Sequence, residues 1–299
     1  MIEMIEINKA FEKQEAVKNV NMTINKGSIY GLIGSNGAGK TTIIKLLAGI
    51  YRQDSGEVRL EGNCIYENQA IKQKIFYISD QPYFFPQYTV RQMANFYKSI
   101  YPLWNESRFS KLAEVFDFSM NKKLHSFSKG IQRQAAFWLA LSTMPEVLIL
   151  DEPMDGLDPV ARRKVKNLLI QDVADREMTI LISSHNLREI EDICDHIGIL
   201  HQGSILLEKD LDDLKSDIHK VQLAYRGETP VHLGQQLPML HCERRGSVLV
   251  CIIRGKEDEI INAIKQTRPV IFDLLPLTLE EIFIYEMGDI GYAIKNIIV

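Results

Sequence analysis

The 299-residue sequence predicts an α/β fold around a buried parallel sheet, followed by a small α+β domain. Two observations predict the sheet: short, strongly apolar runs end at polar or glycine-rich turns, and a helical pattern lies between successive runs. A third observation predicts the second domain. After Gly203 a charged stretch leads into short strands and helices in a different order.

The N-terminal elements follow from their periodicity. Met4–Phe11 and Val20–Ile24 alternate between apolar and polar residues, which is typical of strands with one buried face. Ser28–Ile33 is a continuous apolar run that ends in a glycine-rich loop, and helical spacing begins at Lys40. A longer helical pattern covers Arg91–Phe118.

The central elements repeat the strand–helix alternation. Val147–Leu150 and Thr179–Ser183 are predicted strands, and Val160–Val173 is a predicted helix between them. Asp210–Lys220 is charged and leads into a separate unit. In that unit strands are predicted over Val221–Tyr225, Val248–Ile253 and Val270–Leu274, and helices over Glu257–Lys265 and Leu279–Tyr285.

Bulk composition excludes several classes of protein. The net charge of −4 and pI near 6.0 argue against a protein that coats nucleic acid. No apolar run approaches the roughly 18–20 residues that cross a bilayer, and the N-terminus lacks a signal-peptide pattern. The four cysteines form no CxxC pair, so they are predicted to be reduced thiols of a cytosolic protein: Cys64, Cys194, Cys242 and Cys251.

A phosphate-binding loop follows the third predicted strand. It matches GxxxxGK[ST] and consists of Gly34, Ser35, Asn36, Gly37, Ala38, Gly39, Lys40, Thr41 and Thr42. Its glycines let successive N–H groups turn toward phosphates, and the helix from Lys40 adds its positive N-terminus. Lys40 should reach the β- and γ-phosphates, and Thr41 should place its hydroxyl on Mg²⁺. A chance glycine-rich turn is the alternative, but the strand before the loop and the helix after it argue against chance.

Two acids end the apolar strand Val147–Leu150. Buried strand ends are poor places for carboxylates unless these serve a cation or a proton. Asp151 would hold Mg²⁺, and Glu152 would accept a proton from the attacking water. A strand end with merely solvated acids is the alternative. The loop alone indicates only a nucleoside triphosphate, and no NKxD-type reader of guanine is present in a suitable place.

Five motifs in order resemble the ATP-binding subunits of ABC transporters. They are the phosphate loop, the signature-like Phe127–Ile131 followed by Gln132-Arg133-Gln134, Asp151-Glu152-Pro153, the D-loop Gly156–Pro159, and Ser183-Ser184-His185. The resemblance covers about the first 210 residues. It implies a RecA-like core, an antiparallel β subdomain and a helical subdomain near 83–145, within an ATPase domain 1–212 that precedes an accessory domain 213–299.

The same resemblance implies a mechanism that needs two subunits. Each ATP, bound with Mg²⁺ by one phosphate loop, would be contacted by Ser128, Lys129 and Gly130 of the opposing subunit, in a head-to-tail homo- or heterodimer. Asp158 would also contribute to nucleotide binding. His185 would hydrogen-bond the γ-phosphate and orient the water, and Phe11 would stack on adenine.

Two departures from the family pattern concern the site. The Q-loop glutamine aligns with Asp80, and Gln81 follows it, so either residue could sense Mg²⁺ and the attacking water. In the signature, Lys129 and Ile131 replace a glycine and a glutamine. Lys129 either adds positive charge near the partner's nucleotide or is a solvated lysine.

The tail and the signature most resemble motors of bacterial ABC-2-type exporters of peptides or antibiotics. Leu279–Phe283 resembles a segment that closes their tails, and the aromatic stretch Tyr83–Trp104 lies where the family receives a permease. The expected partner is a transmembrane permease on a separate chain, which would hold this subunit peripherally at the cytoplasmic face of the membrane. The alternatives are a soluble regulatory ATPase and one acting on ribosomes or DNA. The single phosphate loop and the absence of a long insertion disfavour the ribosome- and DNA-acting classes.

Overall fold

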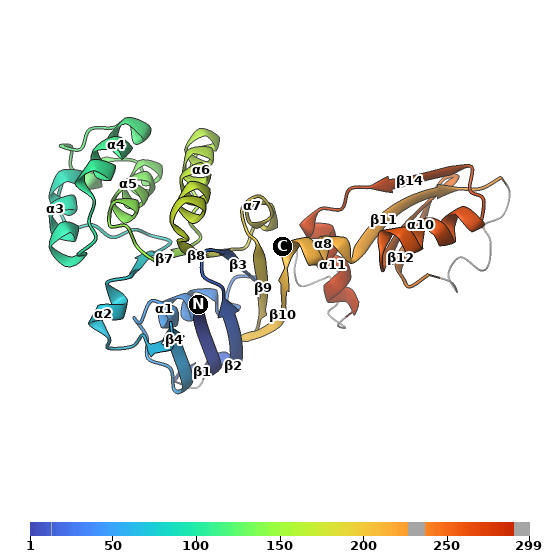
Figure 1. The fold of residues 1–299 in the computed structure, drawn as a ribbon, viewed down its shortest axis with the longest axis horizontal. Helices are drawn as coiled ribbons and strands as arrows, with labels where there is room; N and C mark the ends of the chain where they lie inside the picture. Colours follow the sequence, from blue (N-terminus) through green and yellow to red (C-terminus); the bar gives the residue numbers. More distant parts are fainter. Residues whose placement is uncertain (13, 227–236, 290–299) are drawn as a thin grey trace. The chain divides into compact units, whose positions relative to one another are not determined.

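The computed structural model describes residues 1–12, 14–226 and 237–289 (Figure 1). The chain divides into two compact units, Met1–Glu208 and Lys209–Val299. The expected domain boundary followed residue 212. Residues 227–236 and 290–299 of the expected accessory domain lie outside the described residues.

A six-stranded sheet forms the centre of the first unit. Its strands are β3 (Ile29–Ile33), β6 (Ile75–Ile78), β7 (Val147–Asp151), β8 (Thr179–Ser184), β9 (His196–His201) and β10 (Ser204–Asp210), in the order β10-β9-β3-β8-β7-β6. The pairs β6–β7, β7–β8, β3–β8 and β3–β9 are parallel. Every residue of β3, β7 and β8 is buried, as expected for strands covered on both faces. The predicted α/β fold with a parallel core sheet is confirmed.

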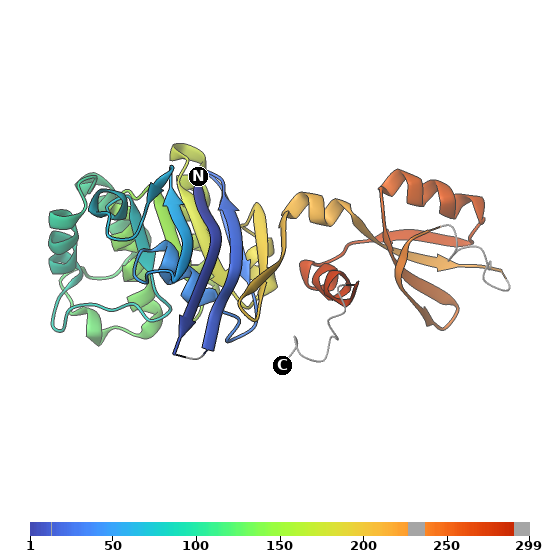
Figure 2. The same ribbon diagram turned by 90° about the horizontal axis from the view of Figure 1, so that it is seen from below.

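An antiparallel sheet packs against this core (Figure 2). It contains β1 (Ile2–Phe11), β2 (Gln14–Ile24), β4 (Ser55–Leu60) and β5 (Asn63–Cys64), in the order β2-β1-β4-β5. Helix α1 (Lys40–Leu47) buries Ile43, Ile44 and Leu47 in the cluster shared with β1, β2 and the core strands. This packing fixes the start of α1, and with it the end of the phosphate loop, against the sheet. The short helix α2 (Gln69–Lys72) precedes β6.

The helical part contains α3 (Val90–Ile100), α4 (Glu106–Phe116), the 3₁₀ turn η1 (Leu124–Ser126) and α5 (Lys129–Ser142). The helical pattern predicted over Arg91–Phe118 is confirmed, and it forms two helices, α3 and α4. Pro102 follows the end of α3, and the Asn105 side chain caps α4 by accepting from the Arg108 N–H, which separates the two helices. The buried rings of Phe109 and Trp138 stack 4.9 Å apart and join α4 to α5.

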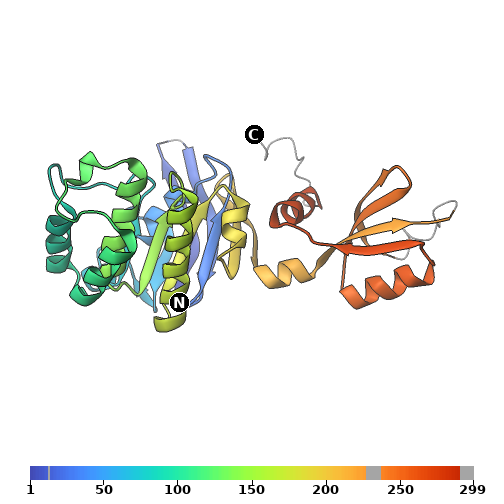
Figure 3. The ribbon, with the colours of Figure 1, turned by 90° about the horizontal axis from the view of Figure 1, so that it is seen from above.

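Helix α6 (Pro159–Arg176) joins β7 to β8 and lies in front of the core strands in Figure 3. Asp158 caps it, accepting from the Val160 and Ala161 N–H groups at 2.9 Å each. Near its end the buried Asp172 carboxylate binds both Arg108 of α4 and Arg176. This ion cluster attaches the helical part to the rest of the unit. Helix α7 (Leu187–Glu191) follows β8.

The second unit is an antiparallel sheet with helices. Its elements are α8 (Leu211–Ser216), β11 (Ile218–Ala224), β12 (Met239–Arg245), β13 (Val248–Arg254), α10 (Glu257–Gln266), β14 (Ile271–Leu275) and α11 (Leu279–Asp289), with strand order β12-β13-β11-β14. The sequence analysis did not predict α8 or β12. Helix α10 packs Ile260 and Ile264 into the cluster that includes Val221 and Ile253. None of the described helices of either unit has the length and apolar character of a membrane span.

One expectation about the cysteines is corrected. Cys242 on β12 and Cys251 on β13 are paired across the antiparallel register, with Cα atoms 4.1 Å apart, and a disulfide joins them. The prediction of four reduced thiols is therefore wrong for this pair. Cys64 and Cys194 are free. The spacing of the two bonded cysteines in sequence gave no indication that their strands are adjacent.

Candidate nucleotide site

The phosphate loop is shaped from behind by two of its small residues. A Cβ atom at Gly34 would lie 2.5 Å from the Leu200 carbonyl oxygen, so only glycine fits there. Ala38 is buried, and its carbonyl accepts the Gly203 N–H at 2.9 Å. Gly39, at φ 110°, precedes α1 and provides no side-chain cap. The first N–H groups of α1 are therefore available to an anion at the positive end of the helix.

Lys40 points into the loop rather than into solvent. Its Nζ donates to the carbonyl oxygens of Gly34 at 2.7 Å and Ser35 at 3.3 Å. The same Nζ lies 3.3 Å from Oε1 of Glu152, and the Lys40 side chain is only 7% exposed. The ammonium is thus placed between the loop and the second carboxylate motif, where a phosphate oxygen would compete with Glu152 for it.

The second motif is held by a serine of the neighbouring strand. Asp151 is 2% exposed at the end of β7, and the Ser183 hydroxyl donates to its Oδ1 at 2.7 Å. The backbone N–H of Glu152 donates to Ser183 Oγ at 3.0 Å. The sequence alone predicts no role for Ser183 beyond its place in the Ser-Ser-His motif. In the structure its hydroxyl fixes the Asp151 carboxylate and the Glu152 backbone at the end of β7.

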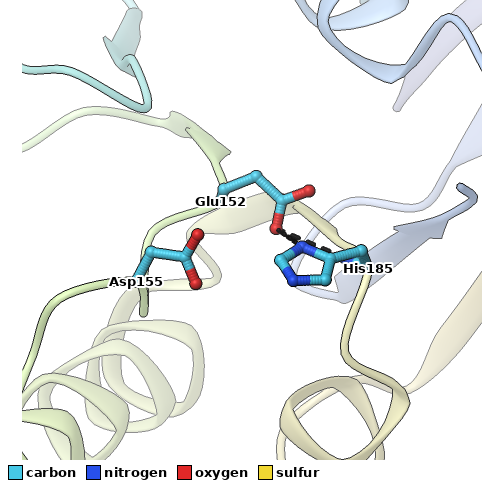
Figure 4. A group of neighbouring side chains, drawn as sticks. All are labelled: Glu152, Asp155 and His185. Atoms are coloured by element: carbon cyan, nitrogen blue, oxygen red, sulfur yellow. Dashed lines mark hydrogen bonds and ion pairs between the residues drawn. The ribbon is translucent and has the colours of Figure 1, made fainter. Parts of the chain in front are cut away.

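Glu152 and His185 face each other at the edge of the parallel sheet (Figure 4). His185 Nδ1 lies 3.0 Å from Glu152 Oε2, and the His185 backbone N–H donates to the same oxygen at 3.3 Å. Asp155 lies beside them, and ligand atoms of the three residues lie within 4.8 Å of one another. A carboxylate whose oxygens bind an imidazole and an ammonium is held in one orientation, which suits a general base.

A second layer supports His185 from α7. Glu189 on that helix accepts from the Ser184 hydroxyl at 3.3 Å and pairs with Arg162 at 3.1 Å. Burial raises the pKa of Glu189, and the charge of Arg162 opposes the rise only in part. The residues on both sides of His185 are therefore tied to α6 and α7.

The loop, the acids and the adjacent β-turns enclose a cavity of about 980 Å³. Its lining includes Ser35, Asn36, Gly37, Gly39, Lys40, Thr41, Thr42, Asp80, Asp151 and Glu152. Hydroxyl and carboxylate oxygens are the ligands that Mg²⁺ prefers, so the donor set of Thr41, Asp151 and Asp80 fits this ion. Gly34 and Ala38 are not among the described lining residues, because they support the loop from outside.

One aromatic side chain in the cavity lining suits a nucleobase. Phe11 is 41% exposed there, its ring lies 5.3 Å from that of Tyr51, and Lys9 Nζ lies 5.4 Å from its centroid. An exposed ring held by a second ring offers a face for stacking. The sequence analysis did not identify the other lining residues of the cavity, which are Gln14, Glu15, Ala16, Lys18, Gln202 and Gly203. The only signal for the last two was a turn-forming dipeptide between two strands.

Asp80 and Gln81 differ in position. Both residues are exposed, but Asp80 lines the cavity and Gln81 is not among the described lining residues. The Gln81 carbonyl accepts the Ser79 hydroxyl at 2.7 Å. Of the two residues the sequence left open, Asp80 is therefore the one that lines the same cavity as Thr41 and Asp151.

The signature turn lies outside this cavity. Ser128 caps α5 and accepts the Ile131 N–H, and Lys129 begins the helix. A Cβ atom at Gly130 would lie 2.6 Å from the Gly156 carbonyl oxygen, so the signature and D-loop segments touch within one chain. None of the described lining residues comes from Ser128–Gly130 or is Asp158. The chain therefore does not bring its own signature to its own phosphate loop.

Comparison with known sequences identifies the family that the chain resembles. Residues 17–155 match the sequence profile of the ABC transporter family. The ABC transporter ATP-binding protein YtrB of Bacillus subtilis is 35% identical over 291 residues, which is 96% of this chain and 98% of the relative. The bacitracin transport ATP-binding protein BcrA of Bacillus licheniformis is 34% identical, covering 72% of this chain and 71% of the relative. The lantibiotic transport ATP-binding protein SrtF of Streptococcus pyogenes is 33% identical, covering 71% of this chain and 92% of the relative.

Solved structures share the fold. An ATP-binding subunit of an ABC transporter superposes with a TM-score of 0.67 at 26% identity, covering 72% of this chain and 92% of that one. A dimeric ATP-binding cassette bound to ADP and Pi superposes with a TM-score of 0.64 at 21% identity, covering 71% and 99%. The motifs, the relatives and the shared fold together place the chain in the ABC transporter family, as an ATP-binding protein that hydrolyses ATP.

Proposed function

We propose that two ATP-binding subunits of this kind close head-to-tail around two Mg-ATP molecules and drive a transmembrane permease on a separate chain. The single observation that supports this arrangement best is the division of the site. The cavity holds Lys40, Glu152 and the loop, while Ser128–Gly130 lies outside it at the exposed start of a helix. A second copy supplies the missing donors when its signature turn faces this cavity.

The geometry supports a role for each residue of the site. The loop and Lys40 bind the phosphates, Phe11 stacks on the base, and Thr41, Asp151 and Asp80 would hold Mg²⁺. That ion would offset the charge on the phosphates. Glu152 accepts the proton of the attacking water, and His185 fixes the orientation of its carboxylate. The outgoing groups are ADP and phosphate.

The aromatic stretch suits a permease contact. Tyr83 and Phe85 are 74% and 37% exposed, and Phe85 packs against Phe96 at 4.8 Å. Deeper in the same row, burial raises the pKa of Tyr97 and of Tyr101 to about 12 each. An exposed aromatic end on a buried aromatic base provides rigid anchors for a partner. The permease would then hold this subunit at the cytoplasmic face of the membrane.

Export of a peptide or antibiotic is the activity we propose, because BcrA and SrtF are named for bacitracin and lantibiotic transport. The competing proposal is a regulatory ATPase without a permease. Co-purification of the tagged chain with a multi-span membrane protein encoded beside it is the expected result. Isolation without such a protein from detergent-solubilised membranes and from the supernatant would favour the regulatory role.

Cross-linking tests the head-to-tail dimer. Cys64 is an exposed free thiol and is first replaced by serine. In the E152Q background, one copy carries S35C and the other K129C, and Mg-ATP is expected to promote an oxidative cross-link between the copies. Glu177, at the end of α6, supplies the control substitution E177C. Equal cross-linking of K129C and E177C to S35C, or no response to Mg-ATP, would contradict the arrangement.

A further inference from the structure

Arg133 is a buried arginine that the motifs leave without a role. It lies one turn after Lys129 on α5, and its side chain is only 9% exposed. Nη1 donates to the backbone carbonyl of Glu152. Nη2 donates to the backbone carbonyl of Asp80 and to its Oδ1, the latter at 3.2 Å. One guanidinium therefore reaches the two segments on which the proposed cation and the proposed base are placed.

The bond to Glu152 acts on an unusual backbone. Glu152 has φ 46°, in the left-handed region that residues other than glycine seldom adopt. Such a conformation persists when the surroundings hold it. Ser183 holds the N–H of Glu152, and Arg133 holds its carbonyl. Both sides of this peptide segment are thus fixed, and the carboxylate is directed toward Lys40 and His185.

The bond to Asp80 acts on charge. Asp80 stands where the family places a neutral glutamine, so this chain has an additional negative charge in the lining of its nucleotide cavity. Where neither a cation nor a cationic side chain offsets it, negative charge there repels a triphosphate. The Arg133 guanidinium is the charged partner that the structure gives to the Asp80 carboxylate.

We propose that Arg133 is a positioning residue with two separable effects. Its planar guanidinium fixes the backbone of Glu152, and its positive charge offsets the negative charge of Asp80. Because Arg133 belongs to α5, the helix that begins at the signature, its bond to the Glu152 carbonyl also ties that helix to the proposed general base of the same subunit. The inference rests on the proposed roles of Glu152 and of the nucleotide cavity.

Steady-state hydrolysis of Mg-ATP by the full chain separates the two effects. R133M keeps an apolar stem but removes the charge and the donors. We expect kcat to fall at least about tenfold and KM for Mg-ATP to rise about tenfold. R133K keeps the charge but cannot span two carbonyl groups as the planar fork does, so kcat should fall about tenfold with KM within about threefold of wild type.

R108M is the matched control. Arg108 is also a partly buried arginine of the helical part, and it pairs with the buried Asp172 away from the nucleotide cavity. R108M should lower the melting temperature while kcat and KM per folded protein stay within about threefold of wild type.

The inference is overturned if R133K hydrolyses Mg-ATP with the wild-type kcat, or if R133M changes kcat and KM no more than R108M does. The R133K result decides even if R133M does not fold. E152Q distinguishes this failure from failure of the proposed function. If E152Q still hydrolyses ATP, the base itself is wrong. If E152Q is inactive and the Arg133 variants are normal, only the role of Arg133 is wrong.

Discussion

Two groups of His185 meet the same carboxylate oxygen of Glu152: the imidazole Nδ1 and the backbone nitrogen both lie within 3.3 Å of Glu152 Oε2. Lys40 occupies the other oxygen at 3.3 Å. The carboxylate is thus oriented from two sides, by a residue that follows β8 and by the first residue of α1. Orientation of a base in this way lowers the reorganisation needed when it accepts a proton.

The first prediction concerns this pair. H185A removes the imidazole and leaves Glu152 held mainly by Lys40, so kcat should fall about a hundredfold with a much smaller change in KM. Phosphate release under saturating Mg-ATP measures the effect. H219A is the control, because His219 lies in the second unit and bonds the Ser216 carbonyl at 3.0 Å. An H185A variant with the kcat of H219A would show that the imidazole is dispensable.

The second prediction concerns the ion cluster that joins α4 to α6. D172N removes the negative charge that pairs with Arg108 and Arg176, in a site where the Asp172 side chain is 2% exposed. Breaking a buried pair in this way should lower the free energy of unfolding by about 2–4 kcal/mol. Both tryptophans, Trp104 and Trp138, report on the helical part, so urea unfolding followed by fluorescence measures the change there.

D175N is the control for that measurement. Asp175 lies on the exposed side of the same helix and accepts a bond from Gln171. Its substitution should change the free energy by no more than about 0.5 kcal/mol. Equal midpoints for D172N and D175N would mean that the cluster contributes no more than a surface pair.

Much of the site could be predicted because its signals are local. The phosphate loop is one unbroken motif, and Val147–Asp151 is an apolar run whose buried end can hold only a functional acid. Lys40, Asp151 and Glu152 meet as soon as β3 and β7 are placed in one parallel sheet. Ordinary rules for such sheets put the carboxyl ends of these strands at one edge.

The residues that could not be predicted depend on contacts between distant segments. Arg133 and Asp80 are 53 positions apart, and nothing near either residue identifies the other. β12 has a weak pattern with mostly half-buried or exposed residues, so its position depends on pairing with β13. The Cys242–Cys251 disulfide was missed for the same reason. The helical pattern over Arg91–Phe118 was predicted, but its division into two helices was not, because the helical period continues across the proline between them.

The third prediction concerns the exposed aromatic end. F85A should weaken binding of the permease at least about tenfold, as loss of a buried aromatic anchor does, while basal hydrolysis in detergent stays near wild type. Affinity of the purified subunit for the permease in nanodiscs measures the effect. F85Y keeps the ring and should bind normally. Loss of ATP binding in F85A would instead assign the ring to folding.

The last prediction concerns the pH dependence of the second unit. Burial pushes the pKa of Glu281 up, but Lys220 at 2.6 Å and the Thr278 N–H push it down further, and the net pKa lies below its usual value. Since the folded state favours the charged form, this contribution is fully present above pH 4.5 and is lost as pH falls through the folded pKa. Glu281 also accepts from Thr278 at the start of α11, so the contact stabilises both β11 and that helix.

E281Q should therefore lower the protection of α11 and β11 against hydrogen exchange near pH 7 by an amount equivalent to about 1 kcal/mol, and by progressively less below pH 4.5. Exchange of the full chain, followed by peptide mass spectrometry and corrected for the intrinsic pH dependence of exchange, measures the difference from wild type. E280Q, the neighbouring substitution on the same helix, should leave protection unchanged at every pH. If the carboxylate charge stabilises the contact, the difference between E281Q and wild type must shrink as Glu281 becomes protonated. A difference that stays constant from pH 7 to pH 3.5 would therefore show that the charge is not what stabilises the contact.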